Sequence, residues 1–207
     1  MKIMRIAVTS LLATLVLVAV AEARGKDAPT APGTYKQWGP DIDTVEILKT
    51  FKASDYDTIV VTRFDTSSTP MPEKSDKSYH SVKAALDGYT ETFTEALRDA
   101  MKGKATVTMG SAAPKKSRAL LIRGKVEGIN PGSRAKRTMG GFGAGAGGNK
   151  LSGSIVDAAT GKVLLRFTQE RRAAGTWKFA GGNDVQVMRD SIHAMGQDVA
   201  QILEQFK

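Results

Sequence analysis

Hydrophobic residues alternate with polar ones in several stretches of the chain and recur every three or four positions in two others. Five stretches have the alternating or β-branched pattern typical of strands: 56–64, 105–109, 118–129, 150–157 and 163–169. In the third stretch, Leu120 and Ile122 alternate with Arg123 and Lys125. Because successive side chains of a strand point to opposite faces, one face of this strand is expected in the core and the other in water.

The last two predicted strands are separated by turn-forming residues. Asp157, Thr160 and Gly161 lie between them, and residues of these types favour tight turns. The sequence therefore predicts a β-hairpin over residues 150–169.

Two longer stretches have helical periodicity. Apolar residues fall on one side of a helix from about residue 78 to 101, and Gly103 is placed to end it. A second amphipathic helix is expected to begin at an Asn183 or Asp184 cap and to end near Phe206.

This order of elements predicts one α+β domain over residues 54–207. The expected fold is a two-layer sandwich, in which a twisted mixed or antiparallel sheet of four to five strands carries two helices on one face. Residues 24–53 are rich in Pro and Gly and are predicted to form an N-terminal arm. Within it, residues 41–53 fit either a short helical turn or a strand.

The first 23 residues have the pattern of a secretory signal peptide. Lys2 and Arg5 precede an uncharged run that ends in small residues at Ala19, Ala21 and Ala23. The run is shorter than the roughly 20 residues that a membrane-spanning helix needs. We therefore expect a bacterial protein that is periplasmic or secreted, and soluble after cleavage.

Composition removes several classes of chemistry. The chain has no Cys and two His, so thiolate catalysis and Cys-ligated metal sites are impossible, and we expect neither a metal site nor a cofactor. Its net charge is +9. Since an exported protein normally meets no nucleic acid, the expected partner is an envelope protein or an anionic lipid surface.

The excess of positive charge is concentrated in one segment. Residues 115–137 contain eight Lys or Arg and one acidic residue, Glu127. This segment is either a solvated face of the sheet or a surface that contacts an anion. The candidate anion-binding or partner-binding residues are Arg134, Lys136, Arg137, Lys125 and Arg123.

A glycine-rich segment follows, with six glycines in residues 140–148. Three interpretations stay open: a mobile loop, an apolar loop that touches a membrane, and a strand start whose backbone is closely approached. For the last interpretation the candidates are Gly141, Gly143 and Gly145. The segment also matches the dinucleotide-binding glycine pattern, but a predicted strand follows it where that motif requires a helix.

The order of these segments resembles a bacterial exported family known as domain of unknown function 4410. The resemblance lies in residues 124–132, in Arg137 leading into residues 141–145, and in residues 154–164, followed by a Gly-rich turn and an amphipathic helix. It implies an exported envelope protein, often a lipoprotein, with no established reaction or cofactor. The chain has no Cys that could be lipidated.

Together these features predict a non-enzymatic binding or assembly module that contacts an anionic component of the cell envelope. One alternative is a hydrolase acting on an envelope polymer, although the chain has no recognisable nucleophile motif. Another is a structural subunit of an envelope complex.

Overall fold

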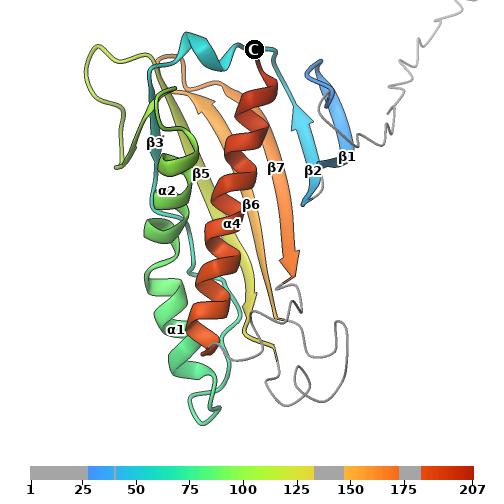
Figure 1. Ribbon diagram of the computed structural model, residues 1–207, viewed down its shortest axis with the longest axis vertical. Coiled ribbons are helices and arrows are strands. Elements are labelled where there is room, and N and C mark those ends of the chain that lie inside the picture. Colours follow the sequence, from blue (N-terminus) through green and yellow to red (C-terminus); the bar gives the residue numbers. More distant parts are fainter. Residues whose placement is uncertain (1–27, 40, 133–146, 173–182) are drawn as a thin grey trace, which may run out of the picture.

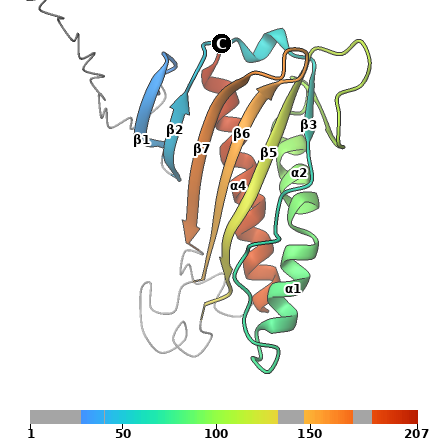
Figure 2. The same ribbon diagram turned by 180° about the vertical axis from the view of Figure 1, so that it is seen from behind.

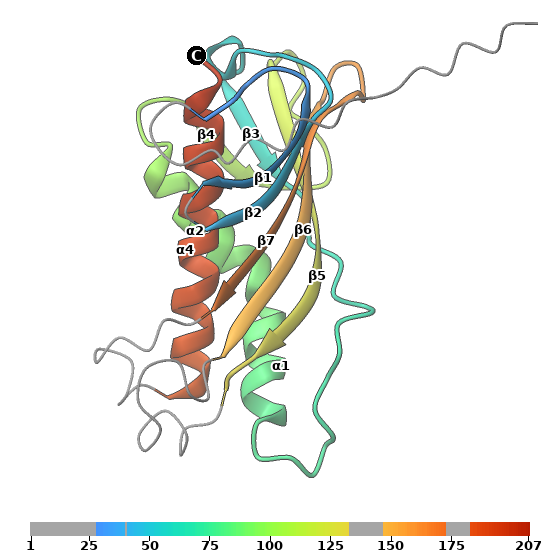
Figure 3. The same ribbon diagram turned by 90° about the vertical axis from the view of Figure 1, so that its right-hand side faces the viewer.

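A computed structural model describes residues 28–39, 41–132, 147–172 and 183–207. A seven-stranded sheet carries the α-helices of these residues on one of its faces, as the edge-on view in Figure 3 shows. The prediction of an α+β protein with two layers is confirmed. The predicted four to five strands and two helices were too few.

The middle of the sheet is antiparallel and contains its longest strands. These are β5 (Ala119–Asn130), β6 (Gly148–Asp157) and β7 (Val163–Arg172), which lie side by side in Figures 1 and 2. The β6–β7 hairpin is confirmed, and its turn is held by the Asp157 carboxylate, which accepts a hydrogen bond from the Thr160 amide at 2.8 Å. Beyond β5, strands β3 (Thr58–Val61) and β4 (Thr106–Met109) run parallel to each other, and β3 is parallel to β5.

Two further strands extend the sheet beside β7. Strand β1 (Gly33–Gly39) pairs with β2 (Ile42–Ile47), and β2 pairs with β7. Both lie in the range predicted as an arm, so the sheet begins about 20 residues earlier than expected. The signal of β1 was weak because it is an edge strand with mostly exposed side chains. Strand β2 falls within residues 41–53, where a strand was one of the two interpretations, and its Val45 and Ile47 are buried.

The helical layer consists of α1 (Tyr79–Asp87), α2 (Tyr89–Ala100) and α4 (Asp184–Gln205). The single helix predicted over residues 78–101 is therefore two helices, separated by Gly88, whose φ and ψ of −102° and 12° are not helical. The predicted Asn183 cap is confirmed, because its side chain accepts a hydrogen bond from the Gln186 amide at 2.8 Å.

Helices α2 and α4 approach each other closely at Gly196. A Cβ atom on Gly196 would lie 2.5 Å from the carbonyl oxygen of Phe93 and 2.9 Å from the Cβ of Ala96. Around this contact the apolar faces of both helices are buried against the sheet, and Phe93, Leu97 and Val199 are fully covered. The packing therefore requires a residue without a side chain at this position.

Within the described ranges, no helix combines the length and the apolar character needed to cross a membrane.

We expect Gly196→Ala to lower the free energy of unfolding by about 1–3 kcal/mol, because the added methyl group overlaps backbone atoms of α2. The direction of this change in stability is informative, because replacing Gly by Ala inside a helix stabilises it by about 1 kcal/mol when nothing else changes. Urea denaturation of the purified variant measures the effect.

The matched control is Gly128→Ala, where an added Cβ would meet no atom within 4 Å. Its stability should stay within about 0.5 kcal/mol of the original protein. A Gly196→Ala variant that is more stable than the original would show that α2 and α4 do not approach each other as described.

Candidate ligand-binding face of the sheet

The face of the sheet opposite the helices is not covered by any helix of the described residues, and we call it the open face (Figure 3). Strand register places its side chains in two rows that cross five strands. The first row, from β1 to β5, is Thr34, Glu46, Arg166, Ser154 and Arg123. The second row, in the same strand order, is Lys36, Thr44, Thr168, Ser152 and Lys125.

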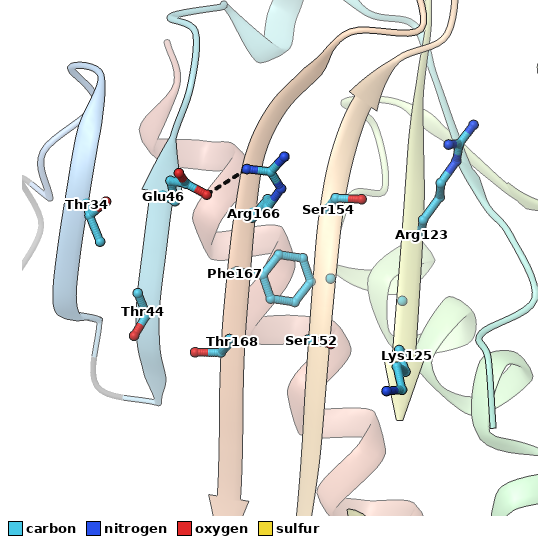
Figure 4. A pocket seen from close by; sticks show the side chains of 12 residues that line it. Thr34, Thr44, Glu46, Arg123, Lys125, Ser152, Ser154, Arg166, Phe167 and Thr168 are labelled. Carbon is cyan, nitrogen blue, oxygen red and sulfur yellow. Dashed lines mark hydrogen bonds and ion pairs between the residues drawn. The ribbon is translucent and has the colours of Figure 1, made fainter. Parts of the chain in front are cut away.

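The two rows border a hollow of about 660 Å³ (Figure 4). Its base is formed by the residues between the rows on the three central strands, Gly124, Gly153 and Phe167, which are directly paired. Residues at these positions direct any side chain toward the helices, and Phe167 is only 2% exposed. Backbone and short hydroxyl side chains therefore line the hollow, with longer charged side chains around it.

Glycines make this arrangement possible. A Cβ atom on Gly153 would overlap the ring of Phe167, and one on Gly124 would lie 2.9 Å from the ring of Phe64. These aromatic rings thus pack directly against strand backbone on the helical side. The three positions where the sequence predicted close backbone approach, Gly141, Gly143 and Gly145, lie outside the described ranges. At the described end of the same glycine-rich segment, a Cβ atom on Gly147, just before β6, would overlap the carbonyl oxygen of Asn130.

The charges on the open face are unequally neutralised. Arg166 forms an ion pair with Glu46 at 2.8 Å (Figure 4), and Lys125 lies 3.5 Å from Glu127. The Ser152 hydroxyl donates to Glu127 at 2.8 Å, and this hydrogen bond, followed by the positive charge of Lys125, lowers the pKa of the Glu127 carboxyl. Glu127 therefore stays ionised and compensates part of the Lys125 charge.

Arg123 differs from these side chains because it is exposed and makes no hydrogen bond or ion pair with the described part of the chain. It projects from the β5 edge of the hollow in Figure 4, on the same face as Lys125. An arginine in this state presents a fork of N–H donors that matches a carboxylate or a phosphate.

Two of the five predicted anion-binding residues, Arg123 and Lys125, are thus brought together on the open face. The other three, Arg134, Lys136 and Arg137, lie outside the described residues. Sequence reasoning missed Arg166 and the hydroxyl side chains of β6 and β7. The signal was present, because the alternation of residues 150–157 and 163–169 already separated Ser152, Ser154 and Arg166 from the core positions.

A family model for a domain of unknown function, DUF4410, matches residues 59–176, which is more than half of the chain. The chain belongs to the DUF4410 family. None of the curated proteins compared with it matches significantly.

Among solved structures, the DUF4410 chain is similar to the PelC dodecamer from Paraburkholderia phytofirmans, with 16% identity, a TM-score of 0.46, and coverage of 74% of this chain and 96% of that one. A DUF330 protein from Xanthomonas campestris is also similar, with 12% identity, a TM-score of 0.43, and coverage of 76% and 87% respectively.

On the helical side of the sheet, the DUF4410 chain buries a polar cluster beneath α4. Asp198 is 7% exposed and forms an ion pair with Arg171, which also lies 3.2 Å from Asp41. Gln169, which is completely buried, donates its amide N–H to Asp198. Burial raises the pKa of Asp198 above its usual range, and the opposing effect of Arg171 does not cancel that of burial.

A second hollow of about 570 Å³ lies at the end of the helical layer, beneath the last turn of α4. Its walls are largely apolar and include Ile59, Leu203 and Phe206. The Tyr56 hydroxyl beside it donates to Asp157 at 2.9 Å, and burial followed by this hydrogen bond raises the pKa of Tyr56 to about 12. None of the predicted anion-binding residues lines this hollow, so the open face is the stronger candidate.

Metal chemistry has no support in the described ranges, where no group of three or more His, Asp or Glu side chains could hold an ion. His80 belongs to α1 and His193 to α4, so neither lies on the open face.

The raised pKa of Asp198 predicts the direction of a pH effect. The folded protein binds the proton of Asp198 more tightly than the unfolded chain, so this residue lowers the free energy of unfolding as the pH rises from about 4. In Asp198→Asn this contribution is absent, while a side-chain oxygen still accepts hydrogen bonds from Gln169 and Arg171. We therefore expect the stability of Asp198→Asn relative to the original protein to increase between pH 4 and pH 7, measured by urea denaturation.

A relative stability that decreases over this pH range would contradict the prediction. It would mean that the ion pair with Arg171 outweighs the cost of burying the carboxylate.

Proposed function

We propose that this protein is exported to the bacterial envelope, where it is a binding module rather than an enzyme and contacts an anionic envelope component through the open face. The observation that carries the proposal is Arg123, an exposed arginine without a partner among the described residues, beside Lys125 on a face that no described helix covers. Such a face gains free energy from a partner with negative charge.

The remaining cations of the segment 115–137 support binding to the same anionic component. Strand β5 ends at Asn130, and the chain continues to Arg134, Lys136 and Arg137 within seven residues. We propose that these three residues contact the same anionic component. At an ionic strength near 0.15 M the screening length is about 8 Å, so only direct contact gives a useful gain.

A binding role fits the open face better than hydrolysis. General acid–base catalysis needs a titratable group close to the reacting atoms. The acidic side chains around the hollow are already engaged, Glu46 by Arg166 and Glu127 by Ser152 and Lys125. What the open face offers a ligand is hydrogen bonds and positive charge.

Export is tested by the mass of the processed protein. When the full chain is expressed in a bacterium, we expect the protein recovered from the periplasm or the medium to lack residues 1–23, or 1–21 if the earlier Ala-x-Ala site is used. Intact-mass spectrometry distinguishes these forms. A full-length protein that stays in the cytoplasm would overturn this part of the proposal.

Binding is tested by co-sedimentation of the purified protein with washed bacterial envelope fragments. We expect the protein to bind, and Arg123→Glu/Lys125→Glu to reduce the affinity at least about tenfold, since each cation near an anionic surface contributes roughly 1 kcal/mol. Binding should weaken as salt is raised from 50 to 300 mM. The measurement is the bound fraction as a function of envelope concentration.

The control is Lys102→Glu/Arg189→Glu, which makes the same change in net charge. Both residues are exposed and belong to the helical side of the molecule, in the turn after α2 and on α4. This variant should bind like the original protein. Absence of binding by the original protein, or equal loss in both variants, would overturn the role of the open face.

A further inference from the structure

The open face contains more hydroxyl groups than an anion-binding surface needs. Five hydroxyl side chains line the hollow: Thr34, Thr44, Ser152, Ser154 and Thr168. Of these five hydroxyls, only that of Ser152 makes a hydrogen bond to another described residue, Glu127. The other four are left to water or to a ligand.

These hydroxyls are arranged in the two rows rather than around a point. Neighbouring strands are about 4.8 Å apart, so a row that crosses five strands extends over about 19 Å. A compact ligand would use only one end of such a site. An elongated ligand lying across the strands could contact both rows along its length.

Arg123 and Lys125 lie at the β5 end of the rows. Arg166, in the middle of the first row, is already paired with Glu46, and Lys36, at the β1 end of the second row, does not line the hollow. Arg123 is paired in register with Ser154, and Lys125 with Ser152, so each cation stands beside a hydroxyl. A ligand that satisfies both groups has negative charges and hydroxyls close together along one chain. Hydroxyl groups both donate and accept hydrogen bonds, so serine and threonine are suitable partners for the hydroxyls of sugars.

The shape of the site disfavours two other anionic partners. A membrane surface would meet the long side chains around the hollow, such as Arg123 and Lys125, before it reached the hydroxyls between them. A protein partner would be expected to bury an apolar centre rich in aromatic side chains. The one aromatic residue that lines the hollow, Phe167, is 2% exposed because its ring lies on the helical side.

We propose that the hollow on the open face binds a linear acidic glycan, whose carboxylates contact Arg123 and Lys125 and whose hydroxyls bond to the serine and threonine rows. This inference rests on the proposed function and identifies the class of its anionic component.

The test measures binding of the purified protein to polygalacturonate and to alginate, two linear polymers of uronic acids. Dextran serves as the neutral glycan, and phosphatidylglycerol vesicles as the anionic surface without sugar chains. Affinity electrophoresis and sedimentation provide the dissociation constants. We expect at least one uronic-acid polymer to bind more tightly than dextran or the vesicles, and Arg123→Glu/Lys125→Glu to remove this binding.

The hydroxyl rows are tested without a change in charge by Ser154→Ala/Thr168→Val. These side chains make no hydrogen bond to other described residues, and Val has the shape of Thr, so the variant should unfold at the temperature of the original protein. Loss of two hydrogen bonds should weaken binding of the acidic glycan about tenfold. The conservative variant Thr168→Ser keeps a hydroxyl and should bind normally.

The possible results separate this inference from the proposed function. Binding to envelope fragments without preferential binding to either uronic-acid polymer would overturn the inference and leave the proposed function standing. Glycan binding that Ser154→Ala/Thr168→Val does not weaken would overturn the assignment of the rows. Vesicle binding that equals glycan binding and depends on Arg123 and Lys125 would identify a membrane surface as the occupant. Failure to bind envelope fragments and all probes would overturn both proposals.

Discussion

The packing of Phe167 across Gly153 is the contact on which both faces of the sheet depend. The ring occupies the space where a Cβ of Gly153 would be, so the central strands can pack an aromatic residue flat against their backbone on the helical side. On the open face, the same three paired residues, Gly124, Gly153 and Phe167, present only backbone. The hollow and the middle of the core therefore lie on opposite faces of the same three residues. A larger residue at Gly153 would disturb the packing beneath the hollow.

The helical layer packs against the sheet on the face opposite the hollow. Helix α4 spans the sheet and approaches α2 at Gly196, where no side chain separates the two backbones. It also carries Asp198 into contact with Arg171 and Gln169 of β7. A buried carboxylate with a raised pKa costs stability at neutral pH, but its contacts with Gln169 and Arg171 connect α4 to β7 at a defined point. Apolar packing alone allows a helix to slide more easily than paired polar groups do.

Much of this fold could be predicted from the sequence because its central elements have strong periodicity. The five strands from β3 to β7, the hairpin turn at Asp157 and the Asn183 cap were all predicted from local patterns. Strand β1 was not predicted, because an edge strand buries few side chains and the residues around it have the Pro and Gly content of a linker. For residues 41–53, which contain β2, a strand was one of the two interpretations left open. The break at Gly88 was missed because the apolar spacing continues across it, so periodicity alone cannot show that the backbone departs from a helix there.

The candidate site could be predicted only in part, because cations that are neighbours in the sequence do not all lie on the same face of the folded protein. Of the cations in the segment 115–137 that the structure describes, Arg118 lies 3.7 Å from Asp57 and Lys125 lies near Glu127. Lys115, Lys116 and Arg123 form no ion pair with the described residues, and of these three only Arg123 lines the hollow. Strand register decides which of them share a face and which hydroxyls of β6, β7 and β2 stand beside them. A shift of one residue in the pairing of β6 with β5 would move Ser152 and Ser154 to the core side and leave Arg123 and Lys125 beside apolar residues. The candidate site is therefore a property of the register of the sheet. Gly124 and Gly153, whose backbones pack against aromatic rings on the helical side, form its base between the cations and the hydroxyl side chains.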